Sequence, residues 1–299
     1  MTDPVASIRQ RLLNHARARS EDFQFVLMRY GLERVLYRIS RSPHAGTFVL
    51  KGAALFQLWT NSPHRPTHDL DLLGQGEPSI DRFVKIFREI CEIECEDGVT
   101  FLVDQVRAER IREDEKYEGV RVRIDARLGN ARIPIQIDIG FGDAITPEPV
   151  EVTYPTFLAM PAPTLRAYPR ETVVAEKFHA LATLGMSNSR MKDFFDLWTL
   201  ARQFEFQGEL LCDALQATFG RRGSPLPSEA PVALTSEFTT DADKLKQWGG
   251  FLQKGKLPPV PLPDVVAAIK MFLEPAAFAR AQGLPFPVRW EPPGPWQAK

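Results

Sequence analysis

The chain has 299 residues, 44% of them hydrophobic and 25% charged, which is ordinary for a globular protein. Its formal net charge of −1 excludes a globally basic nucleic-acid-binding protein, so a nucleic-acid partner would have to bind local patches. The three cysteines form neither a disulfide framework nor a metal pattern, and the first residues lack the apolar run of a signal peptide. No stretch approaches transmembrane length, so we expect a cytoplasmic protein with no membrane partner.

Two helices are expected at the start of the chain, because apolar residues recur at helical spacing between positions 4 and 41. The apolar run at 48–50 then predicts a short buried strand, and the Lys51-Gly52 pair predicts a tight turn. A helix is predicted from Ala53 to Trp59. A glycine turn that opens a helix offers backbone N–H groups to a phosphate.

The Asp69-Leu70-Asp71 run follows in a second predicted strand. Side chains alternate between the two faces of a strand, so Asp69 and Asp71 point to the same side, about 7 Å apart. Two carboxylates so placed repel each other unless a positive group lies between them. The run and the upstream glycine turn together indicate a divalent metal and a nucleoside triphosphate.

A third carboxylate is expected nearby. An amphipathic helix is predicted at 78–95, and strands are predicted at 101–111, 119–129 and 133–140. The last two alternate apolar and polar residues on either side of a Gly129-Asn130 turn, which predicts an antiparallel hairpin. Asp138 then lies on the polar face of its strand. Phosphoryl transfer by two Mg²⁺ ions about 4 Å apart needs such a set of carboxylates.

The remaining chain is predicted to be mainly helical after an irregular linker at 154–171, which contains four prolines. Apolar periodicity and glycine positions predict the helices 171–185, 191–204, 208–220 and 263–281. The proline-rich tail from residue 283 is expected to be extended across the surface.

Four segments in this order resemble the AbiEii/MenT family of nucleotidyltransferase toxins: LKGAALFQLW…RPTHDLDLL, QIDIGFGD, ETVVAEKFHALATLG and SRMKDFFDLWTLA. They cover residues 45–205, and the family belongs to the DNA polymerase β-type superfamily. The resemblance implies an α/β (α+β) fold: a minimal nucleotidyltransferase mixed sheet with flanking helices, followed by a helical C-terminal domain. We place the first domain, with the N-terminal helices, at 1–165 and the second at 166–299.

The resemblance also implies the roles of five residues. Asp69 and Asp71 match the metal-binding pair, and Asp138 matches the third carboxylate. Lys177 matches a lysine that contacts the triphosphate, and Asp193 matches the acidic residue of the last motif. The expected cofactor is Mg²⁺ and the expected substrate a nucleoside triphosphate, with CTP or another pyrimidine nucleotide as the candidate. MenT-like toxins transfer nucleotides to the 3′ end of tRNA, block translation and are paired with an antitoxin.

The chain departs from the family after Gly52, where Ala53 and Ala54 stand in place of Gly, Ser or Thr. Backbone N–H groups then bind the phosphate alone, or Thr67 supplies the missing hydroxyl. Lys51, Gly52, Arg65, Thr67 and Lys177 are therefore the candidate nucleotide-binding residues. Phosphorylation of Thr67 would add negative charge where the nucleotide's phosphates must lie, which is a regulatory hypothesis.

Several alternatives stay open at this point. Lys177 could be a lysine with a buried stem, and Asp193 could favour a helix start. The arginines of the 119–129 strand either follow an RNA backbone or pair with Asp104, Glu109 and Asp125. The Lys/Trp/Phe segment at 244–256 either stacks an unpaired base or is an exposed helix. The rival functions are a nucleotidyltransferase acting on a protein or small molecule, and a non-catalytic binding protein on the same fold.

Overall fold

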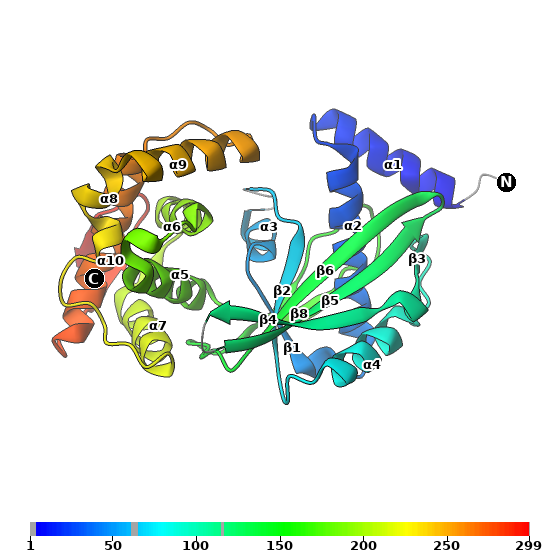
Figure 1. The fold of residues 1–299 in the computed structure, drawn as a ribbon, viewed down its shortest axis with the longest axis horizontal. Coiled ribbons are helices and arrows are strands. Elements are labelled where there is room, and N and C mark those ends of the chain that lie inside the picture. Colours follow the sequence, from blue (N-terminus) through cyan, green and yellow to red (C-terminus); the bar gives the residue numbers. More distant parts are fainter. Residues whose placement is uncertain (1–3, 61–64, 115–116, 299) are drawn as a thin grey trace. The chain divides into compact units, whose positions relative to one another are not determined.

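The computed structural model describes residues 4–60, 65–114 and 117–298, and side chains are described outside 112–118. The backbone contacts divide the chain into two units, which are described separately here (Figure 1). The first unit is Met1–Gly142 with Val150–Ala167, and the second is Asp143–Pro149 with Tyr168–Lys299. In the described part of the chain, no helix is long and apolar enough to cross a membrane. The domain boundary at 165/166 stays a prediction.

The first unit is built on an eight-stranded mixed sheet, which confirms the predicted fold class. Its strands lie in the order β3-β5-β6-β2-β1-β8-β7, and β4 pairs with β5 beside β3. The pairs β2/β6 and β1/β8 are parallel. The strands are β1 Phe48–Lys51, β2 Asp69–Gly74, β3 Val99–Phe101, β4 Arg107–Asp114, β5 Tyr117–Leu128, β6 Ala131–Phe141, β7 Val150–Thr153 and β8 Thr164–Ala167.

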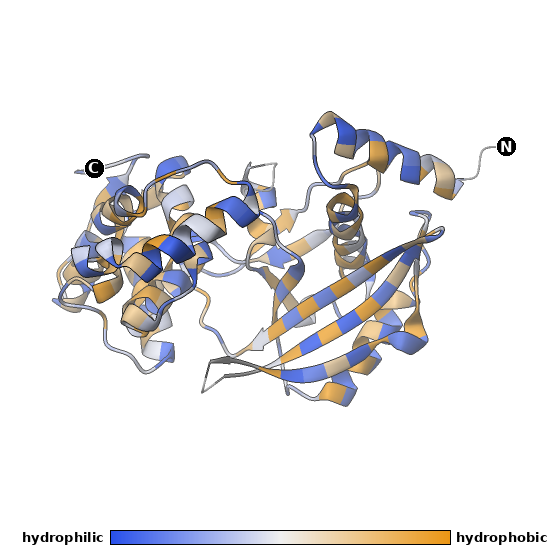
Figure 2. Cartoon of the chain, turned by 45° about the horizontal axis from the view of Figure 1, so that its top comes forward, coloured by the Kyte–Doolittle hydropathy of each residue, from blue (hydrophilic) through white to orange (hydrophobic). Residues whose placement is uncertain are grey.

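One face of this sheet is apolar and packs against helices, as the alternation in the β5–β6 hairpin predicts. Figure 2 shows the alternation as bands of hydrophilic and hydrophobic residues along the strands. Helix α2 approaches so closely that a Cβ on Gly31 would lie 2.6 Å from Ile133 Cγ2, and Phe83 of α4 contacts Phe141 of β6. The helices of this unit are α1 Pro4–Ala18, α2 Phe23–Arg41, α3 Ala54–Thr60 and α4 Ile80–Cys91.

Two of the predicted elements differ in extent. The single strand predicted at 101–111 is wrong, because β3 ends at Phe101 and a 3₁₀ turn at Val103–Gln105 precedes β4. Both strands pair with β5, and the chain between them is longer than the gap between their partners on β5, so the excess residues form the turn. Helix α4 is shorter than the predicted 78–95. It begins after the N-cap Ser79, whose side chain accepts a hydrogen bond from the helix.

The irregular linker predicted at 154–171 is a second correction, because it contains β8, which pairs in parallel with β1. Buried polar groups of α2 hold the chain that leads to this strand. The carboxylate of Glu33 accepts a hydrogen bond from Phe157 N at 2.7 Å, and the Arg34 guanidinium donates to Pro161 O at 3.3 Å. Both side chains are about 1% exposed, so these bonds form where water does not compete.

The second unit is a bundle of helices with a small sheet that the sequence did not predict. The helices are α5 Arg170–Leu184, α6 Met191–Gln203, α7 Gly208–Arg221, α8 Ser236–Thr240, α9 Ala242–Gly255 and α10 Leu262–Ala281. The sheet has the order β11-β10-β9, with β9 Phe206–Gln207, β10 Val288–Trp290 and β11 Trp296–Ala298. The tail is therefore extended, but it does not lie only across the surface. Trp290 is fully buried and donates from Nε1 to Ala201 O at 2.6 Å.

The segment Asp143–Pro149 follows β6 directly but packs within the second unit. Thr172 of α5 exchanges two hydrogen bonds with the backbone of Thr146, at 3.0 and 2.8 Å. Asp143 accepts a hydrogen bond from Tyr168 Oη at 3.3 Å and pairs with Arg222 at 3.6 Å. The second unit thus depends on a short piece of chain that precedes β7 and β8.

Candidate metal centre

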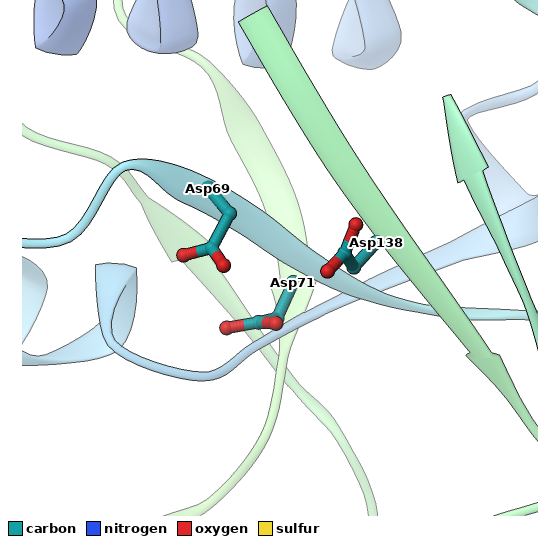
Figure 3. A group of neighbouring side chains, drawn as sticks. All are labelled: Asp69, Asp71 and Asp138. Atoms are coloured by element: carbon teal, nitrogen blue, oxygen red, sulfur yellow. The ribbon is translucent and has the colours of Figure 1, made fainter. Parts of the chain in front are cut away.

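Strand β2 carries two of the three predicted carboxylates and lies between β1 and β6. Its register places Asp71 opposite Lys51 of β1 on one side and opposite Asp138 of β6 on the other. Figure 3 shows Asp69 and Asp71 projecting from β2 with Asp138 beside them on the neighbouring strand. One carboxylate oxygen from each residue lies within 4.8 Å of the other two. The three form an acidic triad of hard oxygen donors, which fits a divalent cation such as Mg²⁺.

Gly52 is required next to this triad for two reasons. Its φ of +73° lies in the left-handed region, which residues with a Cβ rarely adopt. A Cβ at this position would also lie 1.9 Å from Asp71 Oδ2 and 2.6 Å from Asp71 Cγ. The turn between β1 and α3 therefore touches the central carboxylate, and only glycine leaves room for it.

Asp138 is held by Arg121, which lies directly opposite it on β5. Arg121 donates from Nε to Oδ1 at 2.8 Å and from Nη2 to Oδ2 at 2.7 Å, and Asp138 is only 8% exposed. These bonds raise the pKa of the Arg121 guanidinium above its ordinary value. This pair was not predicted from the sequence. A two-residue loop at Gly129-Asn130 places positions 121 and 138 opposite each other, which is the signal that could have identified it.

Asp69 has a different partner. The Thr67 hydroxyl donates to Asp69 Oδ1 at 2.8 Å. The two outer carboxylates of the triad are thus each oriented by one neighbouring side chain, Asp69 by Thr67 and Asp138 by Arg121. Such bonds fix the direction of a carboxylate without using all of its lone pairs.

A pocket within the first unit is lined by two of the five predicted nucleotide-binding residues and by Leu70, which lies between Asp69 and Asp71 on the opposite face of β2. Its lining includes Arg65, Thr67 and both alanines that follow Gly52. Three further polar side chains, which the sequence analysis did not single out, also line it: Arg29, Gln57 and Tyr154. Tyr154 Oη donates to Gln57 Oε1 at 3.3 Å.

Lys177 and Asp193 lie in the second unit, in a buried ionic cluster. Lys177 Nζ is 2.7 Å from Asp193 Oδ1 and 2.8 Å from Asp196 Oδ2, and both carboxylates are fully buried. Arg190 Nε donates to Asp193 Oδ2 at 2.6 Å. Burial alone would raise the pKa of Asp193, but Lys177 and Arg190 outweigh it and hold the pKa below its ordinary value.

Replacing Lys177 with methionine should therefore destabilise the protein by about 3–5 kcal/mol, since the buried Asp193 and Asp196 carboxylates lose the ammonium group that they share, and Arg190 remains beside Asp193. The folded-state pKa of Asp193 is lowered, so its contribution to stability is complete above the ordinary value of 3.8 and is lost as the pH falls below it. The free energy of unfolding, measured with urea, should differ most between the variant and the wild type near neutral pH, and this difference should shrink in acid. Lys246 is exposed on α9, and Lys246→Met is the matched control, with an expected change below about 0.5 kcal/mol. An equal effect of both substitutions would contradict the structural role of the cluster.

Both basic segments of the sequence make defined contacts in the structure. Arg123 pairs with Glu109 at 2.9 Å and Arg107 with Asp125 at 3.6 Å, so the polar strand face does form cross-strand ion pairs with acids. The Lys/Trp/Phe segment is helix α9. Its Trp248 is 3% exposed and donates to Val260 O at 2.7 Å, so this ring is not available for stacking on a base.

Comparison with known proteins gives a family match and matches to solved structures. The family model described as "Nucleotidyl transferase AbiEii toxin, Type IV TA system" matches residues 34–271. The crystal structure of JHP933 from Helicobacter pylori is 15% identical, covers 87% of this chain and 93% of its own, and has a TM-score of 0.45. A second structure, a "putative nucleotidyltransferase from H. pylori", is 14% identical, covers 85% and 92%, and has a TM-score of 0.43. No curated protein matches the sequence.

Proposed function

The chain belongs to the AbiEii family of nucleotidyltransferase toxins of type IV toxin–antitoxin systems, and from this premise we propose the reaction that it catalyses. In the proposed reaction a nucleoside monophosphate moves from a nucleoside triphosphate to the 3′ end of tRNA, which blocks translation. The acceptor hydroxyl attacks the α-phosphorus, a new P–O bond forms, and pyrophosphate leaves. The acidic triad of Asp69, Asp71 and Asp138 is the observation that carries this proposal.

The triad is the proposed Mg²⁺ site. Three carboxylate oxygens within 4.8 Å of one another are hard donors that repel each other, and a divalent cation would offset this repulsion in addition to Arg121, which pairs with Asp138. Bound Mg²⁺ would supply Lewis-acid stabilisation of the charge that develops on the phosphate oxygens. Asp69 and Asp71 would bind the two Mg²⁺ ions, and Asp138 would complete the site.

Asp138 has a further proposed role, which is to accept the proton of the acceptor hydroxyl. Its two oxygens already accept bonds from Arg121, and each keeps a second lone pair for a metal or a proton. Arg121 would keep the carboxylate in one orientation, and Thr67 would do the same for Asp69. Both are positioning residues in this proposal.

The triphosphate is proposed to lie over the turn between β1 and α3. Lys51 ends β1 and Gly52 begins this turn, while Arg65 and Thr67 line the pocket beside it. Lys177, held by Asp193, is assigned to the triphosphate on the family resemblance. CTP or another pyrimidine nucleotide is the proposed donor. The two proposed domains are 1–165, which contains the acidic triad, and 166–299, which contains Lys177.

The family match supports one further element of the proposal, which is a protein partner. Type IV systems pair a toxin with an antitoxin, so we propose a cognate antitoxin as partner. The proposed tRNA acceptor and nucleoside triphosphate are cytoplasmic molecules, which is where we propose that the protein acts.

The proposal is tested by incubating the purified protein with total tRNA, Mg²⁺ and each α-labelled nucleoside triphosphate in turn. We expect label on tRNA from one nucleotide, and its loss when Asp71→Ala protein or EDTA is used. Label on protein with none on RNA would replace the tRNA acceptor with a protein acceptor. Failure to bind Mg²⁺ and nucleotide together would favour a non-catalytic protein.

A further inference from the structure

The polar face of the sheet in the first unit places like charges opposite each other at several positions. Asp71 and Asp138 are register partners on β2 and β6, and these opposed acids form the candidate metal centre. On the same face, Arg107 of β4 is the register partner of Arg123 of β5. Like charges directly opposite on neighbouring strands destabilise a sheet unless a counter-ion lies between them.

A second opposed arginine pair lies further along the same strands. Arg127 of β5 is the register partner of Arg132 of β6, at the end of the hairpin next to its turn. Positions 123, 127 and 132 share the face of Asp138, because β5 and β6 alternate with a period of two and position 121 is paired with 138. Four arginines, which we call the arginine face, thus line the sheet beside the triad: Arg107, Arg123, Arg127 and Arg132.

The acids on this surface only partly compensate these arginines. Asp125 lies 3.6 Å from Arg107 and 4.0 Å from Arg132, so one carboxylate serves two guanidinium groups. Glu109 pairs with Arg123. Among the described residues, Arg127 makes no ion pair.

These arginines are accessible to a ligand. The side chains of Arg107, Arg123 and Arg132 are 66%, 43% and 78% exposed, and Arg127 is exposed as well. Ion pairs between exposed groups contribute about 0–1 kcal/mol, so a polyanion can replace them at little cost. The helices α2 and α4 pack on the opposite, apolar face and leave this surface uncovered.

We infer that the arginine face binds the phosphodiester backbone of the acceptor RNA and leads its 3′ end to the acidic triad. The inference rests on the proposed function and deepens it by assigning the surface that holds the acceptor. The two arginine pairs lie roughly 7 and 20 Å from Asp138 along the strands, counted at about 3.3 Å per residue. A polymer with regularly spaced phosphates can bind both pairs at once, whereas a single small anion can bind only one. Arginine is also the side chain best suited to phosphate, because its planar fork donates two parallel hydrogen bonds.

The test compares Arg127→Gln/Arg132→Gln with Lys85→Gln/Arg88→Gln, which removes the same charge from α4 on the opposite face of the same sheet. Binding of a 5′-labelled tRNA is measured by fluorescence anisotropy without donor nucleotide, between about 0.05 and 0.3 M KCl. We expect the arginine variant to bind tRNA roughly tenfold more weakly than the wild type. The slope of log affinity against log salt concentration should be smaller by about 1.4, which corresponds to two lost phosphate contacts. Its melting temperature should not fall, because an opposed like-charge pair has been removed. The control variant should keep the wild-type affinity and slope.

The outcomes separate this inference from the proposed function. Unchanged tRNA affinity and salt slope in the arginine variant, with wild-type protein that still labels tRNA, would overturn the arginine face and leave the reaction standing. An equal loss of tRNA affinity in the control variant would also overturn the inference, because affinity would then depend on net charge alone. Wild-type protein that neither binds nor labels RNA would remove the RNA acceptor and the inference with it.

Discussion

Asp71→Ala should lower nucleotidyl transfer by roughly a thousandfold or more while leaving the protein folded. Metal-assisted stabilisation of the transferring phosphate amounts to several kcal/mol, and about 4 kcal/mol corresponds to a thousandfold change in rate. Asp71 is the central member of the triad, since it is the register partner of Asp138 and shares β2 with Asp69. Loss of its carboxylate therefore removes the one oxygen donor of the triad that neighbours both of the others.

The stability of the same variant distinguishes a metal centre from a structural acidic cluster. Without metal, three carboxylates within 4.8 Å repel one another, so the variant should melt at the same temperature as the wild type or higher. Added Mg²⁺ should raise the melting temperature of the wild type and not that of the variant, because an ion that binds only the folded state stabilises it. Asp104 is exposed outside the triad, and Asp104→Ala should behave as the wild type in both assays. Full turnover by folded Asp71→Ala protein would remove the metal hypothesis.

Gly52→Ala should be nearly as damaging to transfer, although it changes no charge. The left-handed φ of +73° costs an alanine about 1–2 kcal/mol of stability. The added methyl would also overlap the Asp71 carboxylate, with 1.9 Å to Oδ2 and 2.7 Å to Cβ, so the side chain or the turn must move. A displacement of about 1 Å at a reacting centre can cost roughly a hundredfold in rate, which is the smallest loss that we expect.

Gly46 provides the matched control for this substitution. It lies before β1 in the same unit, and a Cβ there would meet nothing within 4 Å, so Gly46→Ala should leave activity and stability nearly unchanged. The double variant Asp71→Ala/Gly52→Ala adds a second check, with urea unfolding as the readout. Gly52→Ala should cost less stability when the Asp71 carboxylate is absent, because the overlaps with Oδ2 and Cγ are removed, while the contact with Cβ of residue 71 and the φ penalty remain. Equal costs in both backgrounds would show that overlap with the Asp71 carboxylate does not contribute to the loss of stability.

Local periodicity was enough to predict the elements that build the metal centre. Alternation over the β5–β6 hairpin put Asp138 on the polar face, and the spacing of two between Asp69 and Asp71 put both on one face. The same reasoning, applied to the loop length, would also have paired Arg121 with Asp138. That pair was missed because the arginines were considered only with the acids near them in sequence.

Features that depend on contacts between distant segments were not predictable in this way. Strand β8 is short and lies among prolines. It pairs with β7 across the proline-containing segment 154–163, and it joins the sheet through β1, more than a hundred residues earlier in the chain. The bond from Phe157 N to Glu33 and the burial of Trp290 against α6 are likewise tertiary. Nothing in local composition distinguishes a tail that packs into a core from one that crosses a surface.

The path of the chain between its two units limits which fragments and chimaeras of this protein can fold. The chain enters the second unit at Asp143, returns at Val150 and enters it again at Tyr168. A fragment that starts at Tyr168 would lack Asp143 and Thr146, which bond to Tyr168 and Thr172. The helical unit therefore cannot be transferred to another protein as one continuous segment. An exchange between relatives would have to carry the loop after β6 along with the C-terminal part.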